Sequence, residues 1–125
     1  MGNTLVIKKI NFEYIQKIIN DSDYTIINTL PNDKQNCLIK NTLTIEEEIE
    51  FLNKNMNNTN INVILYGLNS YDDTIINKYK QLIKLGYSNI YVYTGGIFEW
   101  LLLQDIYGFD NFQTTSKEID ILKFK

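Results

Sequence analysis

The sequence lacks two residue types on which many catalytic and binding sites depend. It has no His and no Arg, so all 12 basic residues are Lys. Without an imidazole, Ser-His-Asp triads, Cys-His pairs and His-ligated zinc sites are excluded. Without a guanidinium, no planar fork is present to hold a phosphate or carboxylate by two parallel hydrogen bonds. The side chains therefore predict neither a cofactor nor a metal ion.

Charge and cysteine content limit the partners and the cellular location that the sequence predicts. A net charge of -3 and a pI near 4.9 argue against a nucleic-acid partner, because phosphate binding calls for a basic face. The single cysteine, Cys37, excludes an internal disulfide and fits a reducing, cytoplasmic location. Neither a membrane-length apolar run nor a charged-then-apolar leader is evident, so we expect no membrane partner.

Segments typical of strands and helices alternate along the chain. This pattern predicts an α/β domain with a mostly parallel sheet and helices on both faces. A length of 125 residues with 44% hydrophobic content is enough for one domain with a buried core. The expected strands lie at about 5–7, 25–30, 37–39, 63–66 and 90–93. The expected helices lie at about 12–19, 45–55, 74–85 and 98–107.

Local signals mark the ends of several of these elements. Asn11 is a candidate N-cap for the first helix, and Thr44-Ile45-Glu46-Glu47 is a capping box for the second. Asp72 or Asp73 is expected to cap the third helix, which Gly86 ends. Helical spacing predicts that the second helix faces the core with Ile45, Ile49 and Leu52. It predicts the same of a stripe on the third helix: Ile75, Ile76, Tyr79, Leu82 and Ile83.

The stretch from Val63 to Trp100 resembles the rhodanese-like family. The matching segments read "VILYG", "INKYKQLIKLGYSNIYVY" and "TGGIFEW". Active members place there a buried strand, a Cys that opens a six-residue loop, a helix ending near "LGY", and a strand leading to a Gly-Gly turn and a Trp. Residues 26–30 and 37–41 match the first half of the family more loosely. The resemblance implies a three-layer sandwich with a mostly parallel five-stranded sheet, formed by residues 1–125 as a single domain.

The same resemblance indicates that the catalytic apparatus is degenerate. The position of the family's nucleophilic Cys falls on Gly67, and the Asp and Arg of its "DVR" segment fall on Asn28 and Leu30. Asp72 and Asp73 sit at the positive end of the following helix, where they would compete with a bound anion. The rest of the loop offers no cation: Leu68, Asn69, Ser70, Tyr71 and Asp72.

Other residues suggest chemistry that the sequence supports less well. Ser70 has no His or Lys within its loop to act as a base. Cys37 lies near the active-site side of the resemblance, which keeps open a weak or atypical sulfurtransferase or phosphatase-type enzyme that uses Cys37 or the cradle 67–73. The acidic run 46–50 is typical of a solvated helix face at its favourable end rather than a cation site. Gly95-Gly96 indicates a tight turn rather than a phosphate loop.

The last predicted helix is apolar on two sides. One stripe carries Phe98, Leu101, Leu102 and Ile106, and a second carries Trp100, Leu103 and Tyr107. Such a helix must be covered. The candidates are the tail, about 109–125, either folded back or extended, and a partner protein or a second copy of the chain.

The hypothesis that follows is a catalytically inactive rhodanese-like domain acting as a protein-binding or regulatory module. The resemblance implies this role, since family members without the Cys act in protein interaction. Trp100, Leu103 and Tyr107 are the expected interaction surface, and the partner is an unidentified protein or a second copy. The remaining alternatives are the atypical enzyme and a structural protein that self-associates.

Overall fold

A computed structural model describes residues 7–56, 58 and 60–125 of the chain. Its described residues form a four-stranded sheet in the order β1-β4-β3-β2, with every neighbouring pair parallel. The strands are β1 Lys8–Ile10, β2 Tyr24–Asn28, β3 Asn62–Tyr66 and β4 Ile90–Tyr93. The helices are α1 Phe12–Ile18, α2 Ile45–Lys54, α3 Thr74–Lys84 and α4 Gly96–Tyr107. Short 3-10 turns lie at Asn32–Lys34, Phe109–Asn111 and Ile121–Phe124.

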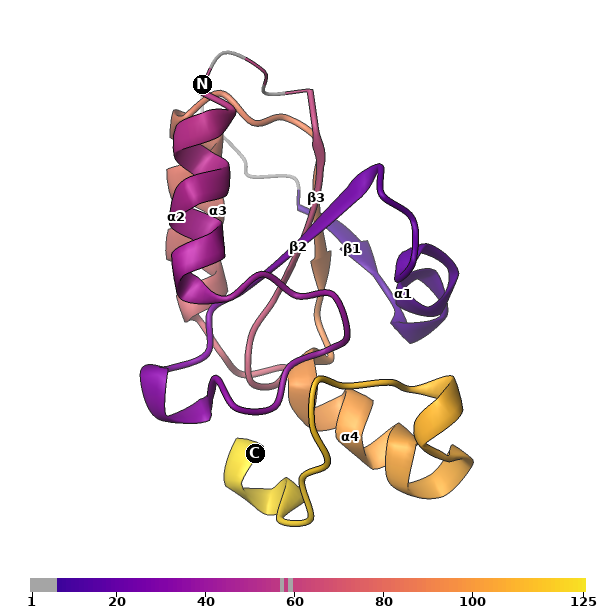
Figure 1. Ribbon diagram of the computed structural model, residues 1–125. Helices are drawn as coiled ribbons and strands as arrows, with labels where there is room; N and C mark the ends of the chain where they lie inside the picture. Colours follow the sequence, from indigo (N-terminus) through magenta and orange to yellow (C-terminus); the bar gives the residue numbers. More distant parts are fainter. Residues whose placement is uncertain (1–6, 57, 59) are drawn as a thin grey trace.

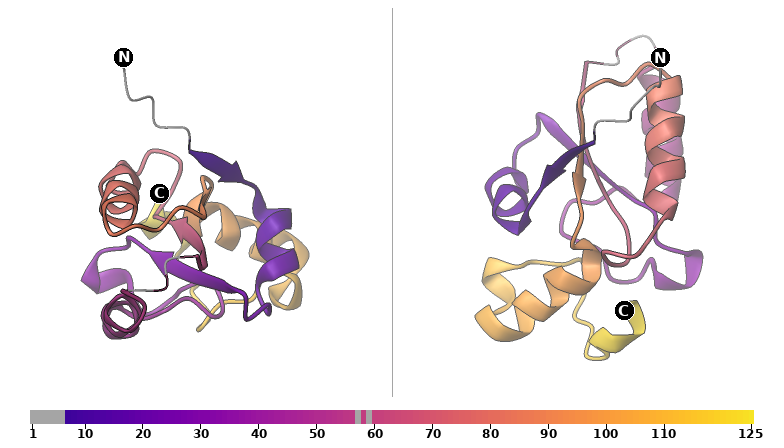
Figure 2. Two further views of the ribbon diagram at one scale, coloured as in Figure 1. Left: turned by 90° about the horizontal axis from the view of Figure 1, so that it is seen from above. Right: turned by 180° about the vertical axis from the view of Figure 1, so that it is seen from behind.

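The helices lie on both sides of the sheet. Helices α2 and α3 cover one face, α1 lies on the other, and α4 sits past the carboxyl ends of the strands (Figures 1 and 2). Because side chains alternate along a strand, neighbouring residues of one strand enter different cores. Ile26 and Ile64 join the core with α1 and α4, whereas Ile27, Val63 and Leu65 join the core with α3. The three-layer α/β architecture is confirmed.

Local sequence signals account for the helix ends. The Asn11 side chain accepts from Tyr14 N at 3.1 Å and caps α1. Thr44 and Glu47 form both hydrogen bonds of the predicted capping box at the start of α2. Gly86, at φ 100°, ends α3 with its N–H bonded to Ile83 O. These contacts join residues close in sequence, which is why the sequence predicts them.

Two expected strands differ in the structure. The first strand is Lys8–Ile10 rather than 5–7, of which residues 5 and 6 lie outside the described residues. Segment 37–39 is no strand: Ile39 forms an isolated bridge with Thr114, so the sheet of the described residues has four strands instead of five. The segment is nevertheless buried, because the Tyr66 hydroxyl accepts from Ile39 N at 3.0 Å and supplies a partner that a ladder would otherwise provide.

Helix α2 also faces the core differently from the prediction. Ile45 and Ile49 are 37% and 55% exposed. Of the three predicted residues only Leu52 packs against the core, and Phe51 joins it there near the end of the helix. The Phe51 ring stacks on Tyr87 with 6.2 Å between centroids. The end of α2 therefore supplies its apolar contacts to the core, whereas its first half contacts α3 through the ion pair between Glu48 and Lys78.

The tail covers α4. Phe112 and Phe124 of the tail (residues 109–125) are 3% and 1% exposed and belong to the same core as α4. By contrast Ile119 and Leu122 are 95% and 62% exposed, so the tail packs back through two aromatic anchors. Part of the apolar surface of α4 is thus buried within the chain itself. Within the described part of the chain, no helix is both long and apolar enough to cross a membrane.

Candidate functional site

The loop between β3 and α3, residues 67–73, lies at the carboxyl edge of the sheet, where α/β proteins usually bind ligands (Figure 1). It rests on the start of α4. Ile97 N donates to Gly67 O at 3.0 Å, and Phe98 N donates to Leu68 O at 2.8 Å. A helix start has free N–H groups that attract anions, and here the loop carbonyls use two of them. The start of α4 is thereby closed to an external anion at these positions.

Gly96 permits this close approach. Its φ of +68° lies in the left-handed region, and a Cβ at this position would stand 2.7 Å from Gly67 O and 2.8 Å from Asn69 N. Both contacts are to backbone, which cannot move aside without shifting the loop. The glycine pair at 95–96 therefore serves a tight turn and a backbone contact.

Asp72 occupies the space beside Gly67. A Cβ built on Gly67 would lie 2.4 Å from Asp72 Oδ2 and 2.9 Å from Thr29 Oγ1. The Asp72 carboxylate accepts from Leu68 N at 2.8 Å and from Thr74 N at 3.0 Å, and Thr74 Oγ1 lies 2.5 Å from Asp72 Oδ1. A carboxylate of the chain itself thus stands where a side chain on residue 67 would begin.

The rest of the loop is also bonded within the chain. Tyr71 N donates to Asn69 Oδ1 at 2.9 Å, and Asn69 Nδ2 donates to Phe124 O at 3.0 Å. The Tyr71 ring is 94% exposed. Ser70 is exposed as well, and Asp72, the carboxylate nearest to it in the sequence, is engaged with Leu68 and Thr74. The Asp72 carboxylate is thus engaged elsewhere and does not serve Ser70 as a base.

Cys37 lies apart from this loop, in the core under the tail. It is 3% exposed, and its Sγ donates to Ser116 O at 3.5 Å. Burial raises the pKa of the thiol above its ordinary value. A nucleophilic cysteine requires the thiolate, so these surroundings disfavour reactivity.

A small cavity of about 190 Å³ lies between the loop, β1 and β4. The lining of the cavity includes one lysine, Lys9, which belongs to β1. Lys9 lies outside the first strand as the sequence predicted it, at 5–7. Lys9 reaches this place because β1 pairs with β4 in the register Lys9↔Val92, a long-range pairing that no local signal reveals. The volume is below the usual range for small-molecule sites. The cavity lining also includes Asn69, Ser70, Asp72, Tyr93 and Thr94.

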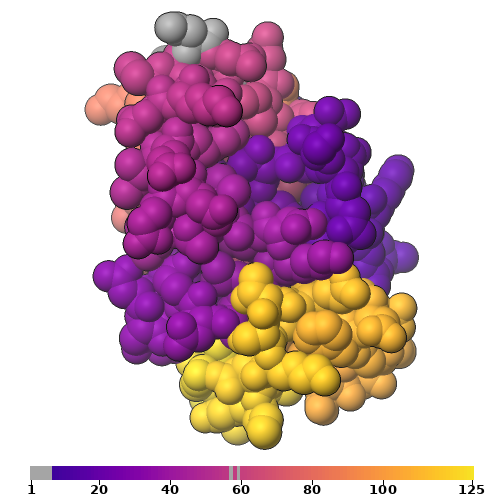
Figure 3. Space-filling model, viewed as in Figure 1, coloured from indigo at the N-terminus to yellow at the C-terminus, as the bar shows by residue number. Residues whose placement is uncertain are grey.

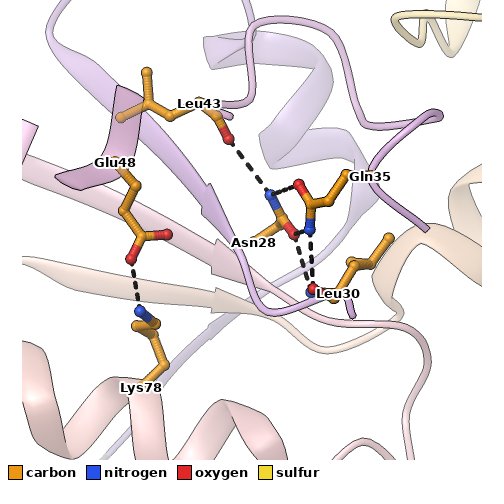
Figure 4. Close-up of polar contacts among 6 residues, drawn as sticks. All are labelled: Asn28, Leu30, Gln35, Leu43, Glu48 and Lys78. Atoms are coloured by element: carbon orange, nitrogen blue, oxygen red, sulfur yellow. Dashed lines mark hydrogen bonds and ion pairs between the residues drawn. The ribbon is translucent and has the colours of Figure 1, made fainter. Parts of the chain in front are cut away.

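Asn28, at the end of β2, is a buried amide with its hydrogen bonds met (Figure 4). It accepts from Leu30 N at 2.9 Å and from Gln35 Nε2 at 2.8 Å. It donates to Gln35 Oε1 at 3.3 Å and to Leu43 O at 3.4 Å. Leu30 is also buried, at 5% exposure. Because Asn28 and Leu30 are uncharged residues, neither position that the resemblance assigned to a charged pair carries a charge. The network stabilises the turn after β2.

The acidic run at the start of α2 is a solvated helix face for most of its length. Glu46, Glu47 and Glu50 are exposed, whereas Glu48 forms an ion pair with Lys78 of α3 at 2.6 Å (Figure 4). No group of three or more Cys, Asp or Glu side chains is placed to hold a metal ion among the residues that the structure describes.

Of the three residues in the predicted interaction surface on α4, one is buried and two are accessible at the surface. Trp100 is 0% exposed and donates through Nε1 to Gln113 O at 3.1 Å, so its place on a surface is wrong. The tail buries it, which the helical pattern alone does not show. Tyr107 is 62% exposed and Leu103 is half-buried, and both line a groove of about 390 Å³ between α1 and α4. Other residues of the groove are Phe12, Gln16, Asn111 and Phe112.

No protein-family model matches the chain, and no curated protein sequence matches it either. Several solved structures, by contrast, superimpose on the chain. The Alr3790 protein from Anabaena sp. superimposes with a TM-score of 0.60 at 12% identity, over 91% of this chain and 97% of that protein. The solution structure of the rhodanese-like domain of the same Anabaena protein gives 0.56 at 14% identity, over 92% and 89%. The chain has the rhodanese-like fold.

A further structure, the EanB T414V variant in complex with hercynine, superimposes with a TM-score of 0.58 at 16% identity. That match covers 74% of this chain and 25% of the EanB chain, so this chain spans about a quarter of the length of that protein. At these identities the likeness concerns the fold. The contents of loop 67–73 are therefore judged on their own contacts.

Proposed function

We propose that this rhodanese-like domain is catalytically inactive and acts as a protein-binding module. The observation that carries the first half is the Asp72 carboxylate, 2.4 Å from the place where a Cβ on Gly67 would stand. Sulfur transfer requires a thiolate stabilised by nearby donors. Here residue 67 has no side chain, and Leu68 N, a donor of the loop, is bonded to Asp72.

Cys37 does not replace the missing nucleophile. Its Sγ faces the Ser116 carbonyl, an acceptor, and burial holds the thiol protonated. It is also absent from the lining of the cavity beside loop 67–73. The alternative of an atypical enzyme thus gains no support from the surroundings of this cysteine.

The groove between α1 and α4 supports the second half of the proposal. It is lined mainly by apolar side chains, among them Phe12, Leu103 and Tyr107. Ile106, on the same helix, is 68% exposed. Clustered apolar side chains at a surface are typical of protein-protein contacts. We place the partner contact here, with Leu103 and Tyr107 retained from the predicted surface and Trp100 removed from it.

A thiosulfate:cyanide sulfurtransferase assay tests the loss of catalysis. We expect no turnover from the wild type or from Cys37→Ser. Gly67→Cys alone should also be inactive, because the Asp72 carboxylate obstructs the new side chain and its charge raises the thiol pKa. Wild-type turnover that disappears in Cys37→Ser would refute the proposal.

Capture of protein partners tests the surface. Tyr107→Lys together with Leu103→Asp should abolish binding, whereas Ile49→Lys should not, since Ile49 is 55% exposed on the distant helix α2. Light scattering on the same proteins reports the oligomeric state and so identifies a second copy as the partner. Unchanged partners and an unchanged oligomeric state in the double variant would contradict the assignment.

A further inference from the structure

The tail crosses the carboxyl edge of the sheet, on which loop 67–73 lies. Its first half is bonded to segment 36–40: Thr115 N donates to Leu38 O at 2.8 Å, and Leu38 N donates to Thr115 Oγ1 at 3.0 Å. Ser116 Oγ donates to Asn36 O at 2.7 Å. Figure 3 shows the tail, in yellow, against this segment at one end of the molecule. The tail is therefore firmly attached up to Ser116.

Its second half is attached differently. Residues 119, 120, 122 and 123 are exposed, Ile121 between them is partly buried against the core, and Phe124 is buried to 1% exposure. The Phe124 carbonyl accepts from Asn69 Nδ2 at 3.0 Å, which joins the tail to loop 67–73. Leu68 of that loop packs against the core to which Phe124 belongs. The exposed residues 119 and 120 thus connect the attached half to a short 3-10 turn, Ile121–Phe124, which packs on the core through Ile121 and Phe124.

We propose that segment 121–125 is a releasable plug, and that the socket it fills docks a partner segment of the same chemistry. That chemistry is an aromatic residue preceded by lysine and aliphatic residues, as in Ile121-Leu122-Lys123-Phe124. The inference rests on the proposed function only in treating the domain as a binding module. Its site is the socket of Phe124, separate from the groove at Leu103 and Tyr107.

The contacts of the plug define what the partner must supply. The socket receives one aromatic ring, and Asn69 receives one backbone carbonyl. Lys123 forms an ion pair with Glu118, which lies before the plug. A basic residue just before the aromatic ring of the partner would meet the same carboxylate. These three contacts together select the class of segment.

The attachment also accounts for release. Segments held by few buried contacts open locally without unfolding the domain. Here the span of residues 117–120 separates the plug from the bonds at Thr115 and Ser116, so Ile121 and Phe124 can leave while the first half of the tail stays in place. The core around Trp100 keeps its cover, because Gln113, to which Trp100 donates, lies before the span.

Binding of the isolated plug sequence in trans tests the proposal. The full chain with Phe124→Ala has an empty socket and should bind a labelled peptide ILKFK, whereas the wild type should bind it at least ten-fold more weakly because its own plug competes. The peptide ILKAK should bind neither protein. Equal binding by variant and wild type, or equal binding of the two peptides, would overturn the proposal. Fluorescence of Trp100 establishes that the variant is folded.

Limited proteolysis of the wild type provides a second measurement that needs no variant. Trypsin should cut after Lys117 and Lys123 much faster than after Lys80 in α3, because opening of the tail does not require unfolding of the helix. Cleavage at all three positions at one rate would show that the plug leaves only on global unfolding, and would refute the inference. Both tests avoid the groove and the sulfurtransferase assay, so their failure is distinguishable from failure of the proposed function.

Discussion

The Tyr66 hydroxyl holds a buried segment that has no strand to join, and its removal should destabilise the protein strongly. Tyr66 is 0% exposed. Its oxygen accepts from Ile39 N at 3.0 Å and lies 2.8 Å from Thr42 Oγ1. Thr42 itself donates to Ile39 O at 2.6 Å, so the tyrosine hydroxyl donates to Thr42. Tyr66→Phe removes both bonds of the hydroxyl and leaves the ring in place.

The magnitude follows from the groups left without partners. Ile39 is 0% exposed, so its N–H group would remain buried and unpaired, at a cost of about 1–3 kcal/mol. The lost bond to Thr42 adds a further contribution of about 1 kcal/mol. We expect Tyr66→Phe to lower the free energy of unfolding by about 2–4 kcal/mol.

Tyr87→Phe is the matched control. Tyr87 is 2% exposed, and its buried hydroxyl has no hydrogen-bond partner among the described residues. Removal of this hydroxyl abolishes a desolvation cost and no bond, so stability should be unchanged or should rise by up to about 1 kcal/mol. The two variants make the same chemical change at two buried rings, and they differ in what the hydroxyl contacts.

Urea unfolding followed by Trp100 fluorescence measures both variants. Trp100 is the one tryptophan of the chain and is 0% exposed, so its emission reports the loss of the core. With a slope of about 2 kcal/mol per M, the Tyr66→Phe midpoint should fall by about 1 M or more. Equal midpoints for the two variants would refute the view that the hydroxyl of Tyr66 secures segment 37–39.

Three further predictions follow from single groups. Burial, and then the hydrogen bond to the Glu99 carboxylate, raise the pKa of the Tyr93 hydroxyl above its ordinary value. The stability that Tyr93 contributes is therefore fully present up to about pH 10 and is lost at higher pH, by up to about 1.4 kcal/mol per pH unit. Tyr93→Phe should reduce the alkaline slope of the unfolding free energy, and an unchanged slope would count against this cause. Cys37 should react with a thiol reagent about 100-fold more slowly in the native protein than in urea, since it is 3% exposed with a raised pKa; similar rates would show it to be accessible. Gly96→Ala should cost about 2 kcal/mol or more in urea unfolding, because its φ is positive and its Cβ would meet backbone 2.7 Å away. Gly95→Ala should cost less, because its Cβ would meet the side chain of Glu99 and no backbone; equal costs would contradict the contact.

The state of loop 67–73 illustrates what can be inferred before a structure is known. The sequence indicates that Asp72 and Asp73 compete for the start of α3, and Asp72 does accept from Thr74 N. It does not indicate that the same carboxylate fills the space beside Gly67, because this depends on how β2, β3 and α3 meet. Sequence reasoning also missed Thr29, whose hydroxyl would lie 2.9 Å from a Cβ on Gly67. Its position could have indicated it, because Thr29 directly follows β2, which ends at the same edge of the sheet as β3.

The sequence by itself determined the alternation of strands and helices, the caps at Asn11 and Thr44, and the end of α3 at Gly86. These features depend on residues within about four positions of one another, so local patterns suffice. It also showed that α4 is too apolar to stand uncovered. Only the tertiary structure decided what covers it, because a hydrophobic pattern states that a face is buried without naming its partner. Trp100 therefore lies under the tail rather than on a surface, and Lys9 reaches loop 67–73 through a pairing between the first and last strands of the described sheet.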